Sequence, residues 1–350
     1  MDKPRVFVTR KVDEAAIALL ETVADVEVWP DYKAPSKGAL LSNTKDVDGI
    51  LANTEDRIDE DVLAVSNGRL KVVANMAVGF DNLDVNTATG LGIAMSNTPG
   101  VLTKTTAELG FALMMAVSRK IVAGDRDVRD GKWQNWHPSA YLGVDLAGST
   151  LSVIGMGKIG FEFAKRAKAF EMRVLYHNRS PRKDIGEGFE YCGKLETALE
   201  QADFLCITTP LTKETHHFIG KAQLSLMKPA SILINIARGA VVDNIALFEA
   251  LKEGRIAGAG LDVTEPEPIP ADHPLLTLAN VVITPHIGSA SQRTRRDMAV
   301  LAAQNIKARL SGEPMPSCVN PEAMTRKTQR EKEEEYALEV LREEEDEEEV

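Results

Sequence analysis

Three charged or titratable side chains in the second half of the chain could together do chemistry on a carbonyl group. Arg238, Glu267 and His286 each come shortly after a short apolar run that is typical of a buried β-strand. The carboxyl ends of parallel strands meet at one edge of a sheet, which is where such sheets bind their ligands. The sequence therefore predicts that these three side chains share one site.

Each of the three residue types has a distinct capacity. An arginine side chain is always cationic, so Arg238 can hold a substrate carboxylate and polarise the carbonyl beside it. An imidazole changes its charge near neutral pH, so His286 can give a proton to the carbonyl oxygen as hydride arrives at the carbon. A neighbouring carboxylate orients an imidazole and favours its protonated form, which is the role predicted for Glu267.

A glycine-rich turn indicates the source of that hydride. Leu151–Ile154 is a predicted strand that runs through a GxGxxG pattern into a predicted helix at Phe161–Phe170. In this pattern Gly155 allows a tight turn, Gly157 lets a pyrophosphate approach the backbone, and Gly160 lets the helix pack close to the strand. The phosphates would then meet the N-terminus of the helix. A strand before the pattern and a helix after it make dinucleotide binding a strong prediction.

The end of the next predicted strand indicates which dinucleotide is bound. An acidic residue there would bind the ribose 2′-hydroxyl of NAD. The neutral Asn178 stands at that position, and Arg179 and Arg182 follow it. A carboxylate would repel a 2′-phosphate, whereas arginine side chains fit it in geometry and charge, so NADP(H) is predicted to be preferred and NAD(H) to bind more weakly. The remaining expected cofactor contacts are Met156, Lys158, Ile159, Ser180, Pro210, Gly288 and Thr106.

Short β-rich runs alternate with helical patterns along the chain, which is typical of parallel sheets covered by helices. The predicted strands are Arg5–Thr9, Val26–Trp29, Gly49–Ala52, Lys71–Ala74 and Ile93–Met95, then Leu151–Ile154, Arg173–Tyr176, Asp203–Ile207, Ser231–Ile236, Gly258–Leu261 and Val281–Thr284. Long helices are predicted at Thr103–Ser118 and Arg293–Leu310. The predicted fold class is α/β, with two doubly wound parallel-sheet domains.

In this arrangement a Rossmann-type cofactor domain, residues 99–289, is inserted into a discontinuous, flavodoxin-like substrate domain made of residues 1–98 and 290–322. A ligand is expected in the cleft at the junction. Residues 323–350 are expected to form an acidic tail that is disordered or a solvated helix.

Charge and composition argue against several other classes of protein. The net charge is −11, and residues 326–350, with twelve acidic and five basic residues, carry −7 of it, so neither part predicts a basic surface for nucleic acid. No apolar run approaches the roughly 20 residues of a membrane span. Three scattered cysteines fit a reducing cytoplasm. No metal site is expected, because the adjacent His216 and His217 would point to opposite faces of a strand.

Six stretches together resemble the D-isomer-specific 2-hydroxyacid dehydrogenase family over nearly all of residues 4–320. They are VGFDNLDV at 78–85, TTAELGFALMM at 105–115, GMGKIG at 155–160, INIARGAVVD at 234–243, GLDVTEPEP at 260–268 and TPHIGSAS at 284–291. The resemblance implies that Arg238, Glu267 and His286 are catalytic. It also implies that the backbone of Val78 and Gly79 binds the substrate carboxylate, that Ser289 lines the pocket, and that Asp262 and Ile236 touch the nicotinamide.

Within that family, GKWQNWHP at 131–138, NRSPR at 178–182 and DHPLLTLANVVITPHIGSAS at 272–291 resemble the branch that reduces glyoxylate to glycolate and hydroxypyruvate to D-glycerate. Ala140 stands where that branch carries a bulky aromatic residue, so 2-ketogluconate or a broader range of 2-keto acids stays open as the substrate.

The resemblance also bears on partners. It implies a homodimer joined through the cofactor domain near residues 110–145, where Trp133, Trp136 and Tyr141 suit an interface, although packing within one chain would explain them nearly as well. Some family members are nucleotide-sensing corepressors that bind protein partners. The turn at Asn178 and Arg179 speaks against that alternative, because such proteins are expected to carry an acidic residue there.

Overall fold

The computed structural model describes residues 3–325, and its contacts divide the chain into two compact units. Of the described residues, 3–102 and 291–325 form the first unit, and Thr103–Ala290 form the second. The domain boundaries expected at residues 98 and 290 stay predictions. The expected acidic tail lies outside the described residues except for its first three, which end the short 3₁₀ helix Pro321–Thr325.

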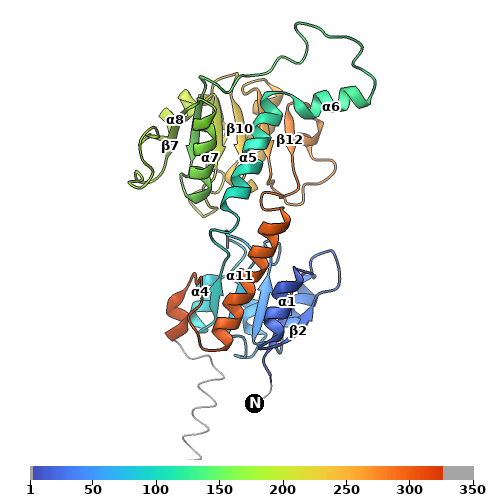
Figure 1. Ribbon diagram of the computed structural model, residues 1–350, viewed down its shortest axis with the longest axis vertical. Helices are drawn as coiled ribbons and strands as arrows, with labels where there is room; N and C mark the ends of the chain where they lie inside the picture. The colour runs from blue at the N-terminus through green and yellow to red at the C-terminus, as the bar shows by residue number, and fades with distance from the viewer. Residues whose placement is uncertain (1–2, 326–350) are drawn as a thin grey trace, which may run out of the picture. The chain divides into compact units, whose positions relative to one another are not determined.

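The first unit contains a five-stranded parallel sheet with the strand order β2-β1-β3-β4-β5 (Figure 1). This is the flavodoxin-like order, in which the chain winds first to one side of β1 and then to the other. The strands are β1 (Arg5–Val8), β2 (Asp25–Val28), β3 (Gly49–Ala52), β4 (Val72–Asn75) and β5 (Ala94–Ser96). The helices are α1 (Glu14–Glu21), α2 (Lys37–Thr44), α3 (Glu60–Ala64), α4 (Val85–Gly90) and α11 (Gln292–Leu310).

Side-chain caps set where the helices of this unit begin, and α1 and α11 are examples. The carboxylate of Asp13 accepts a hydrogen bond from the backbone N–H of Ala15 at 2.9 Å and caps the start of α1. The hydroxyl of Ser291 accepts one from Thr294 at 3.2 Å at the start of α11. Helix α11 packs on α1, β3 and β4, so a helix from late in the chain completes a core whose strands lie within the first 100 residues.

The second unit contains a seven-stranded parallel sheet with the order β12-β11-β10-β9-β6-β7-β8. Its strands are β6 (Thr150–Ile154), β7 (Arg173–His177), β8 (Glu190–Tyr191), β9 (Phe204–Ile207), β10 (Ile232–Asn235), β11 (Gly258–Leu261) and β12 (Val281–Ile283). The sequence predicted six of these and missed β8, because two exposed residues carry no strand periodicity. The predicted fold class is confirmed.

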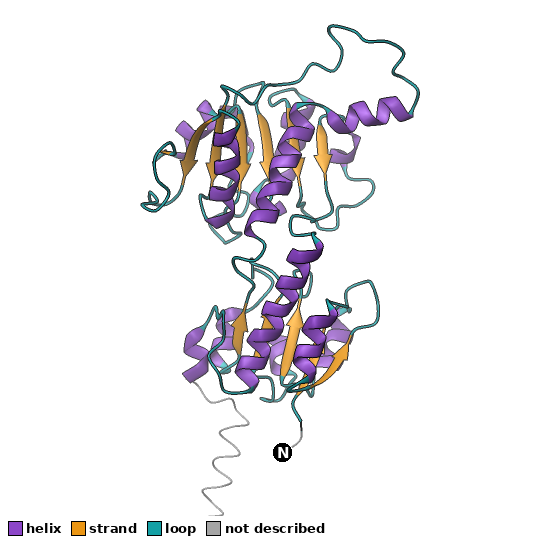
Figure 2. Ribbon diagram, in the orientation of Figure 1, coloured by secondary structure: helices purple, strands orange, loops and turns teal. Residues whose placement is uncertain are grey.

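Helices cover both faces of this sheet. They are α5 (Thr103–Ser118), α6 (Ile121–Arg129), α7 (Lys158–Ala169), α8 (Leu195–Gln201), α9 (Lys221–Leu226) and α10 (Asn244–Lys252). Helices α5 and α7 pack together over one face (Figure 1, Figure 2). Neighbouring residues of β9 serve different cores: Phe204 and Cys206 pack beneath α5 and α7, whereas Leu205 and Ile207 pack beneath α8, α9 and α10. This two-sided burial explains why the strands are continuously apolar rather than alternating.

The strand order places a topological switch point between β6 and β9. From β6 the chain passes through α7 to β7 on one side, and it later returns to β9 on the other side. Helices on opposite faces leave a crevice beyond the carboxyl ends of these two strands, where doubly wound sheets bind their ligands. The Gly155–Gly160 loop leaves β6 at this crevice, and Thr208 and Thr209 leave β9 there.

The prediction that His216 and His217 point to opposite faces of a strand is wrong. Both residues lie in a turn after β9, and His217 has a left-handed backbone with a φ of 50°. Side chains alternate between faces only along extended backbone, so this turn places both rings on the same side. Their centroids lie 4.0 Å apart and their planes are inclined by 28°.

No helix among residues 3–325 is both long enough and apolar enough to cross a membrane.

Candidate active site

The loop after β6 has the backbone shape that the glycine pattern predicted. Gly155 has a φ of +96°, and a Cβ atom at this position would lie 2.6 Å from the backbone nitrogen of Thr209. A Cβ at Gly160 would lie 2.6 Å from the carbonyl oxygen of Gly155. Any larger residue at either position would push the loop away from β9 or α7 from β6. The hydroxyl of Thr208 donates to the Gly155 carbonyl at 2.7 Å and ties the two loops of the switch point together.

The N-terminus of α7 is open toward this crevice. Gly157 is the N-cap and is exposed, and no side chain among the described residues caps the first N–H groups of the helix. A Cβ at Gly157 would have only the Gly155 carbonyl oxygen nearby, at 3.9 Å. The residues present therefore fit a dinucleotide, because uncapped N–H groups and the helix dipole attract a pyrophosphate. Of the other loop residues, Lys158 is exposed, Ile159 is half-buried and Met156 is buried.

The turn after β7 divides its predicted cofactor residues into two groups. Arg179 and Ser180 are exposed and stand at the edge of the loop. Asn178 and Arg182 instead contact the glycine loop: the Asn178 side-chain oxygen accepts from Met156 N at 2.7 Å, and Arg182 Nη1 donates to the Gly157 carbonyl at 3.1 Å. Arg182 also pairs with Asp184. The structure thus shows a bracing role for Asn178 and Arg182 that the sequence did not reveal, because it joins loops 20 or more residues apart.

The structure brings His286 and Glu267 into direct contact. His286 Nδ1 lies 2.5 Å from Glu267 Oε1, and about a third of each side chain is exposed. The second oxygen of Glu267 accepts from the backbone N–H of Thr264 at 3.2 Å. Because Nδ1 is engaged, Nε2 of His286 is the ring nitrogen left for a substrate.

The electrostatics of Glu267 suit a carboxylate that stays ionised. Partial burial acts to raise the pKa of Glu267, but the hydrogen bond from His286 and the positive charges of His286 and Arg238 outweigh it, so the pKa lies below its usual range. Arg238 is half-buried directly after β10, and its carbonyl accepts from the Asn235 side chain at 2.8 Å. All three predicted catalytic residues lie in the second unit, at the carboxyl edge of its sheet.

A buried carboxylate holds the turn that carries His286. His286 has a φ of 53°, a conformation that costs free energy for any residue other than glycine. Asp262, 2% exposed, accepts hydrogen bonds from the backbone N–H groups of Ile287 and Gly288, both at 2.8 Å, and from the Thr284 hydroxyl at 2.7 Å. Burial raises the pKa of Asp262, and these three hydrogen bonds lower it in part.

This arrangement gives Asp262 a positioning role that the sequence did not reveal. The sequence offered only an acidic residue after a strand, and the contact with the His286 turn spans more than 20 residues. The contact of Asp262 with the nicotinamide stays a prediction.

The remaining predicted residues of the second unit differ in their burial. Thr106 lies buried in the first turn of α5, and a Cβ at Gly288 would come within 3.2 Å of its methyl group, so these two residues face each other. Ile236 and Ser289 are buried, whereas Pro210 is exposed.

Val78 and Gly79 belong to the first unit, where two side-chain amides hold their loop. Asn97 donates to the Val78 carbonyl at 2.8 Å, and the fully buried Asn75 donates to the Gly79 carbonyl at 2.9 Å. The backbone N–H groups of this loop are therefore presented in a fixed orientation, as anion binding by a backbone requires. The sequence did not single out Asn75 or Asn97, since asparagine at the end of a strand is also common in ordinary turns.

A glycine loop at the switch point of a doubly wound sheet, with an arginine and a histidine–carboxylate pair at the same sheet edge, defines the class of nucleotide-dependent dehydrogenases. Residues 111–288 match the model of the D-isomer specific 2-hydroxyacid dehydrogenase NAD-binding domain. The chain belongs to the D-isomer-specific 2-hydroxyacid dehydrogenase family, which confirms the resemblance seen in the sequence.

Two glyoxylate reductases are similar to this chain over almost their full length. The chain is 49% identical over 325 residues to a glyoxylate reductase of Korarchaeum cryptofilum, which covers 92% of this chain and 97% of that protein. It is 47% identical over 329 residues to a glyoxylate reductase of Thermococcus litoralis, covering 92% of this chain and 98% of that protein.

Two solved structures have the same fold. A Thermus thermophilus protein is 46% identical, with a TM-score of 0.85, and covers 90% of this chain and 99% of its own. An NADPH-dependent glyoxylate/hydroxypyruvate reductase of Sinorhizobium meliloti, solved with NADP and malonate, is 33% identical, with a TM-score of 0.83, and covers 93% of this chain and 99% of its own.

Proposed function

We propose that this protein reduces small 2-keto acids with NADPH, converting glyoxylate to glycolate and hydroxypyruvate to D-glycerate. The observation that carries this proposal is the contact of His286 with Glu267 on a strained turn, at the same sheet edge as an open glycine loop. The names of the relatives support the choice of substrate, since both Korarchaeum cryptofilum and Thermococcus litoralis proteins are glyoxylate reductases.

In this proposal each side chain has a distinct role. Arg238 binds the substrate carboxylate and polarises the carbonyl, because its guanidinium group fits a carboxylate in geometry and charge. When bound, NADPH supplies the hydride that adds to the carbonyl carbon. His286 gives its Nε2 proton to the carbonyl oxygen, which becomes the hydroxyl of the product. Glu267 holds the imidazole in one orientation for that step through its contact with Nδ1.

The preference for NADPH is proposed to reside in Arg179. Its exposed side chain stands next to Asn178, which already accepts a hydrogen bond from the glycine loop. A neutral residue there leaves a 2′-phosphate unopposed, and an arginine beside it supplies charge-assisted hydrogen bonds. The NADP complex of the Sinorhizobium meliloti reductase supports this choice.

The substrate carboxylate is proposed to bind the backbone of Val78 and Gly79, with Ser289 lining the pocket. The fixed orientation of the first loop by Asn75 and Asn97 supports that role. Ala140 is exposed, and its small side chain stands where the resemblance places a bulky aromatic residue, so 2-ketogluconate and other 2-keto acids belong in the test.

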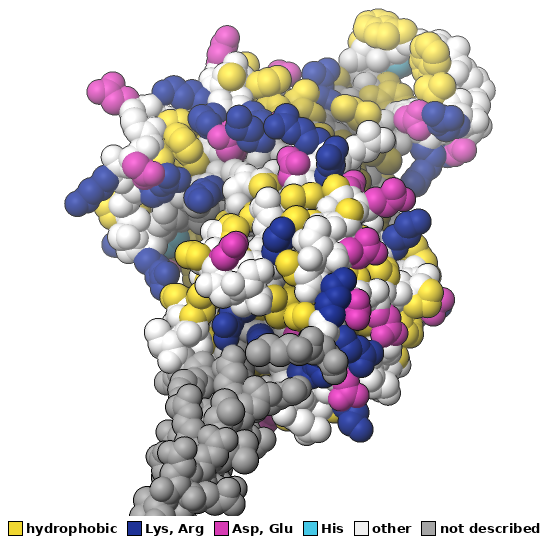
Figure 3. Space-filling model, turned by 60° about the horizontal axis from the view of Figure 1, so that its bottom comes forward, with side chains coloured by type: hydrophobic (Ala, Val, Ile, Leu, Met, Phe, Trp, Pro, Cys, Tyr) yellow, Lys and Arg dark blue, Asp and Glu magenta, His cyan; other side chains and the backbone are white. Residues whose placement is uncertain are grey.

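A homodimer in the cytoplasm is proposed as the working form. Large apolar side chains are exposed on α6 and the segment after it, including Trp133 (60% exposed) and Trp136 (81%). Hydrophobic side chains gather on the projecting segment at the upper right of Figure 3. Packing within one chain does not bury these residues, and exposed aromatic clusters of this kind mark interfaces. Sedimentation should show a dimer in the native protein and a monomer in Trp136→Asp.

The first experiment is a comparison of initial rates with NADPH and NADH against glyoxylate, hydroxypyruvate, pyruvate and 2-ketogluconate. Fast oxidation of NADPH by the first two substrates would support the proposal. A clear preference for 2-ketogluconate would keep the chemistry and change the substrate. Absence of turnover with either nucleotide would overturn it and favour a protein that binds partners instead.

A further inference from the structure

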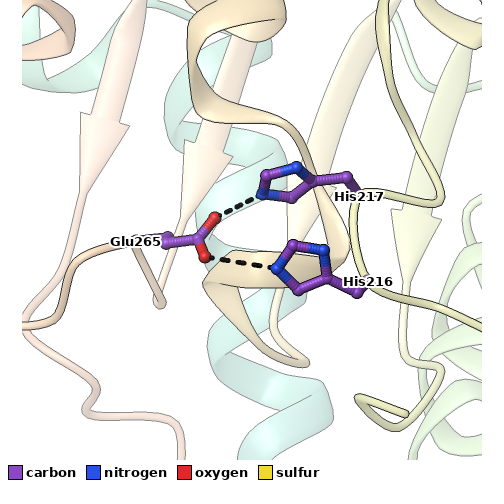
Figure 4. Close-up of side chains that lie close together, drawn as sticks. All are labelled: His216, His217 and Glu265. Carbon is purple, nitrogen blue, oxygen red and sulfur yellow. Dashed lines mark hydrogen bonds and ion pairs between the residues drawn. The ribbon is translucent and has the colours of Figure 1, made fainter. Parts of the chain in front are cut away.

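Two histidines and a glutamate on the second unit bring three metal-ligating side chains to one point on the surface. His217 Nε2 lies 2.7 Å from one oxygen of Glu265, and His216 Nε2 lies 3.6 Å from the other (Figure 4). Nitrogen and oxygen ligand atoms of all three residues lie within 4.8 Å of one another. We propose that His216, His217 and Glu265 form a binding site for a divalent transition-metal ion such as Zn²⁺.

The spacing of the three ligand atoms suits this kind of ion. Zinc binds imidazole nitrogen and carboxylate oxygen at about 2.0–2.2 Å, which puts tetrahedral ligand atoms roughly 3.4 Å apart. The two histidines lie 2.7 and 3.6 Å from different oxygens of Glu265, on either side of that value, and one ligand atom from each of the three residues lies within 4.8 Å of the others. Rotation of these exposed side chains, with loss of the His217–Glu265 hydrogen bond, would therefore admit the ion. Each histidine would present the lone pair of Nε2 and keep its proton on Nδ1.

The backbone already holds the ligands near one another. The N–H of His217 donates to the Ala240 carbonyl at 2.7 Å, and the left-handed backbone at His217 stacks its ring on that of His216. On the opposite side, the carbonyl of Glu265 accepts from the buried Asn244 side chain at 2.5 Å. A site whose ligands are already gathered loses little conformational freedom when it binds an ion.

The donor set also selects the type of ion. Two imidazoles and one carboxylate favour Zn²⁺, Co²⁺, Ni²⁺ or Cu²⁺, whereas Mg²⁺ and Ca²⁺ prefer oxygen ligands alone. Between 37% and 52% of each side chain is exposed, so water can complete the coordination.

A bound ion would act on the segment that carries Glu267. Glu265 stands two residues before Glu267 on the chain that follows β11, and His216 and His217 follow β9. The ion would therefore fasten the Glu267 segment to a second loop. The proposed metal site therefore lies close in sequence to Glu267, and neither Glu267 nor His286 is one of its ligands.

The test is a titration of the untagged, chelator-treated full chain with ZnCl₂, followed by calorimetry and by competition with a chromogenic chelator. The proposal expects one equivalent of Zn²⁺ to bind, a rise in the melting temperature with Zn²⁺, and no such binding of MgCl₂. Loss of one ligand, in His216→Ala or Glu265→Gln, should weaken binding by about tenfold or more. The double variant His216→Ala/His217→Ala should no longer bind the one equivalent of Zn²⁺.

Two controls make the test decisive. His137→Ala removes an exposed histidine of the same unit and should leave the titration unchanged. Circular dichroism of each variant without metal should match the native protein, and Glu265→Gln keeps the size of the side chain in case the alanine variants misfold. The proposal is overturned if the native protein binds no Zn²⁺, or if one equivalent of Zn²⁺ still binds to the correctly folded double variant.

Discussion

The loop after β6 and the turn after β12 both leave the carboxyl edge of the seven-stranded sheet, but they are held in different ways. The first depends on missing side chains, since Cβ atoms at Gly155 and Gly160 would overlap neighbouring backbone. The second depends on one side chain that is present, the carboxylate of Asp262, which accepts three hydrogen bonds from the His286 turn.

Under the proposed function the two constructions serve different ligands. A phosphate is large and charged and is bound by backbone N–H groups, so the loop that binds it must lack bulky side chains. A proton donor must present one atom in one direction, so its turn must be rigid even at the cost of a left-handed backbone at His286. One sheet edge can therefore supply both openness and stiffness, from loops that follow strands four positions apart in the sheet.

The largest expected effect comes from removal of the proposed proton donor. His286→Ala should lower kcat by about a hundredfold or more, because general-acid catalysis contributes at least that much. The KM for NADPH should change little, since the glycine loop is untouched. Steady-state kinetics with glyoxylate would check this, and near-normal turnover would remove His286 from the mechanism.

A smaller loss is expected when the stiffness of the His286 turn is reduced. Asp262→Asn replaces one acceptor oxygen with a donor that faces a backbone N–H, which destabilises the His286 turn by about 1–3 kcal/mol. Because a small misplacement of a catalytic group is costly, kcat should fall by roughly ten- to a hundredfold. Thr284→Val is the matched control, since it removes only one of the three hydrogen bonds to the same carboxylate.

The two kinetic constants separate the roles of Asp262. A pure positioning residue should lower kcat and leave the KM for NADPH near its native value. A rise in that KM with kcat unchanged would instead support the predicted contact of Asp262 with the nicotinamide.

The cofactor preference should shift by about tenfold toward NADH in the double variant Asn178→Asp/Arg179→Ala. The change removes a charge-assisted hydrogen bond and adds a carboxylate beside the 2′-phosphate, while the introduced carboxylate can still accept from Met156 N. The measurement is the ratio of kcat/KM for NADPH and NADH. An unchanged ratio would exclude this turn as the source of the preference, and Lys183→Ala, an exposed basic residue nearby, serves as the control.

The smallest effects should distinguish the glycines of the loop. Gly155→Ala should destabilise the protein by at least about 1–2 kcal/mol, because its φ of +96° is unfavourable for any other residue and its Cβ would meet Thr209. Gly157→Ala should leave the melting temperature almost unchanged, since its Cβ would have open space, yet weaken NADPH binding. Equal melting temperatures for the two variants would contradict the account of the loop given above.

Local patterns were sufficient for most of the architecture. Short β-rich runs predicted eleven strands, and all eleven are present within a residue or two. Most of them are buried on both faces and leave a clear apolar signal, whereas β2 alternates between exposed and half-buried residues. The backbone shape of the glycine loop was also predictable, since a tight turn and a close helix approach each require a residue without a side chain. The exposed two-residue strand β8 carries no such signal and was missed.

The contacts that complete the candidate site are of another kind. Asp262 reaches a turn more than 20 residues later, and Asn178 and Arg182 reach back to the glycine loop. Such hydrogen bonds form only after sheet pairing has brought the strand ends together, so the local sequence pattern cannot predict them. The left-handed backbone at His217 reverses the prediction made from its sequence neighbour, because the direction of a side chain depends on dihedral angles that the tertiary contact with Ala240 helps to hold.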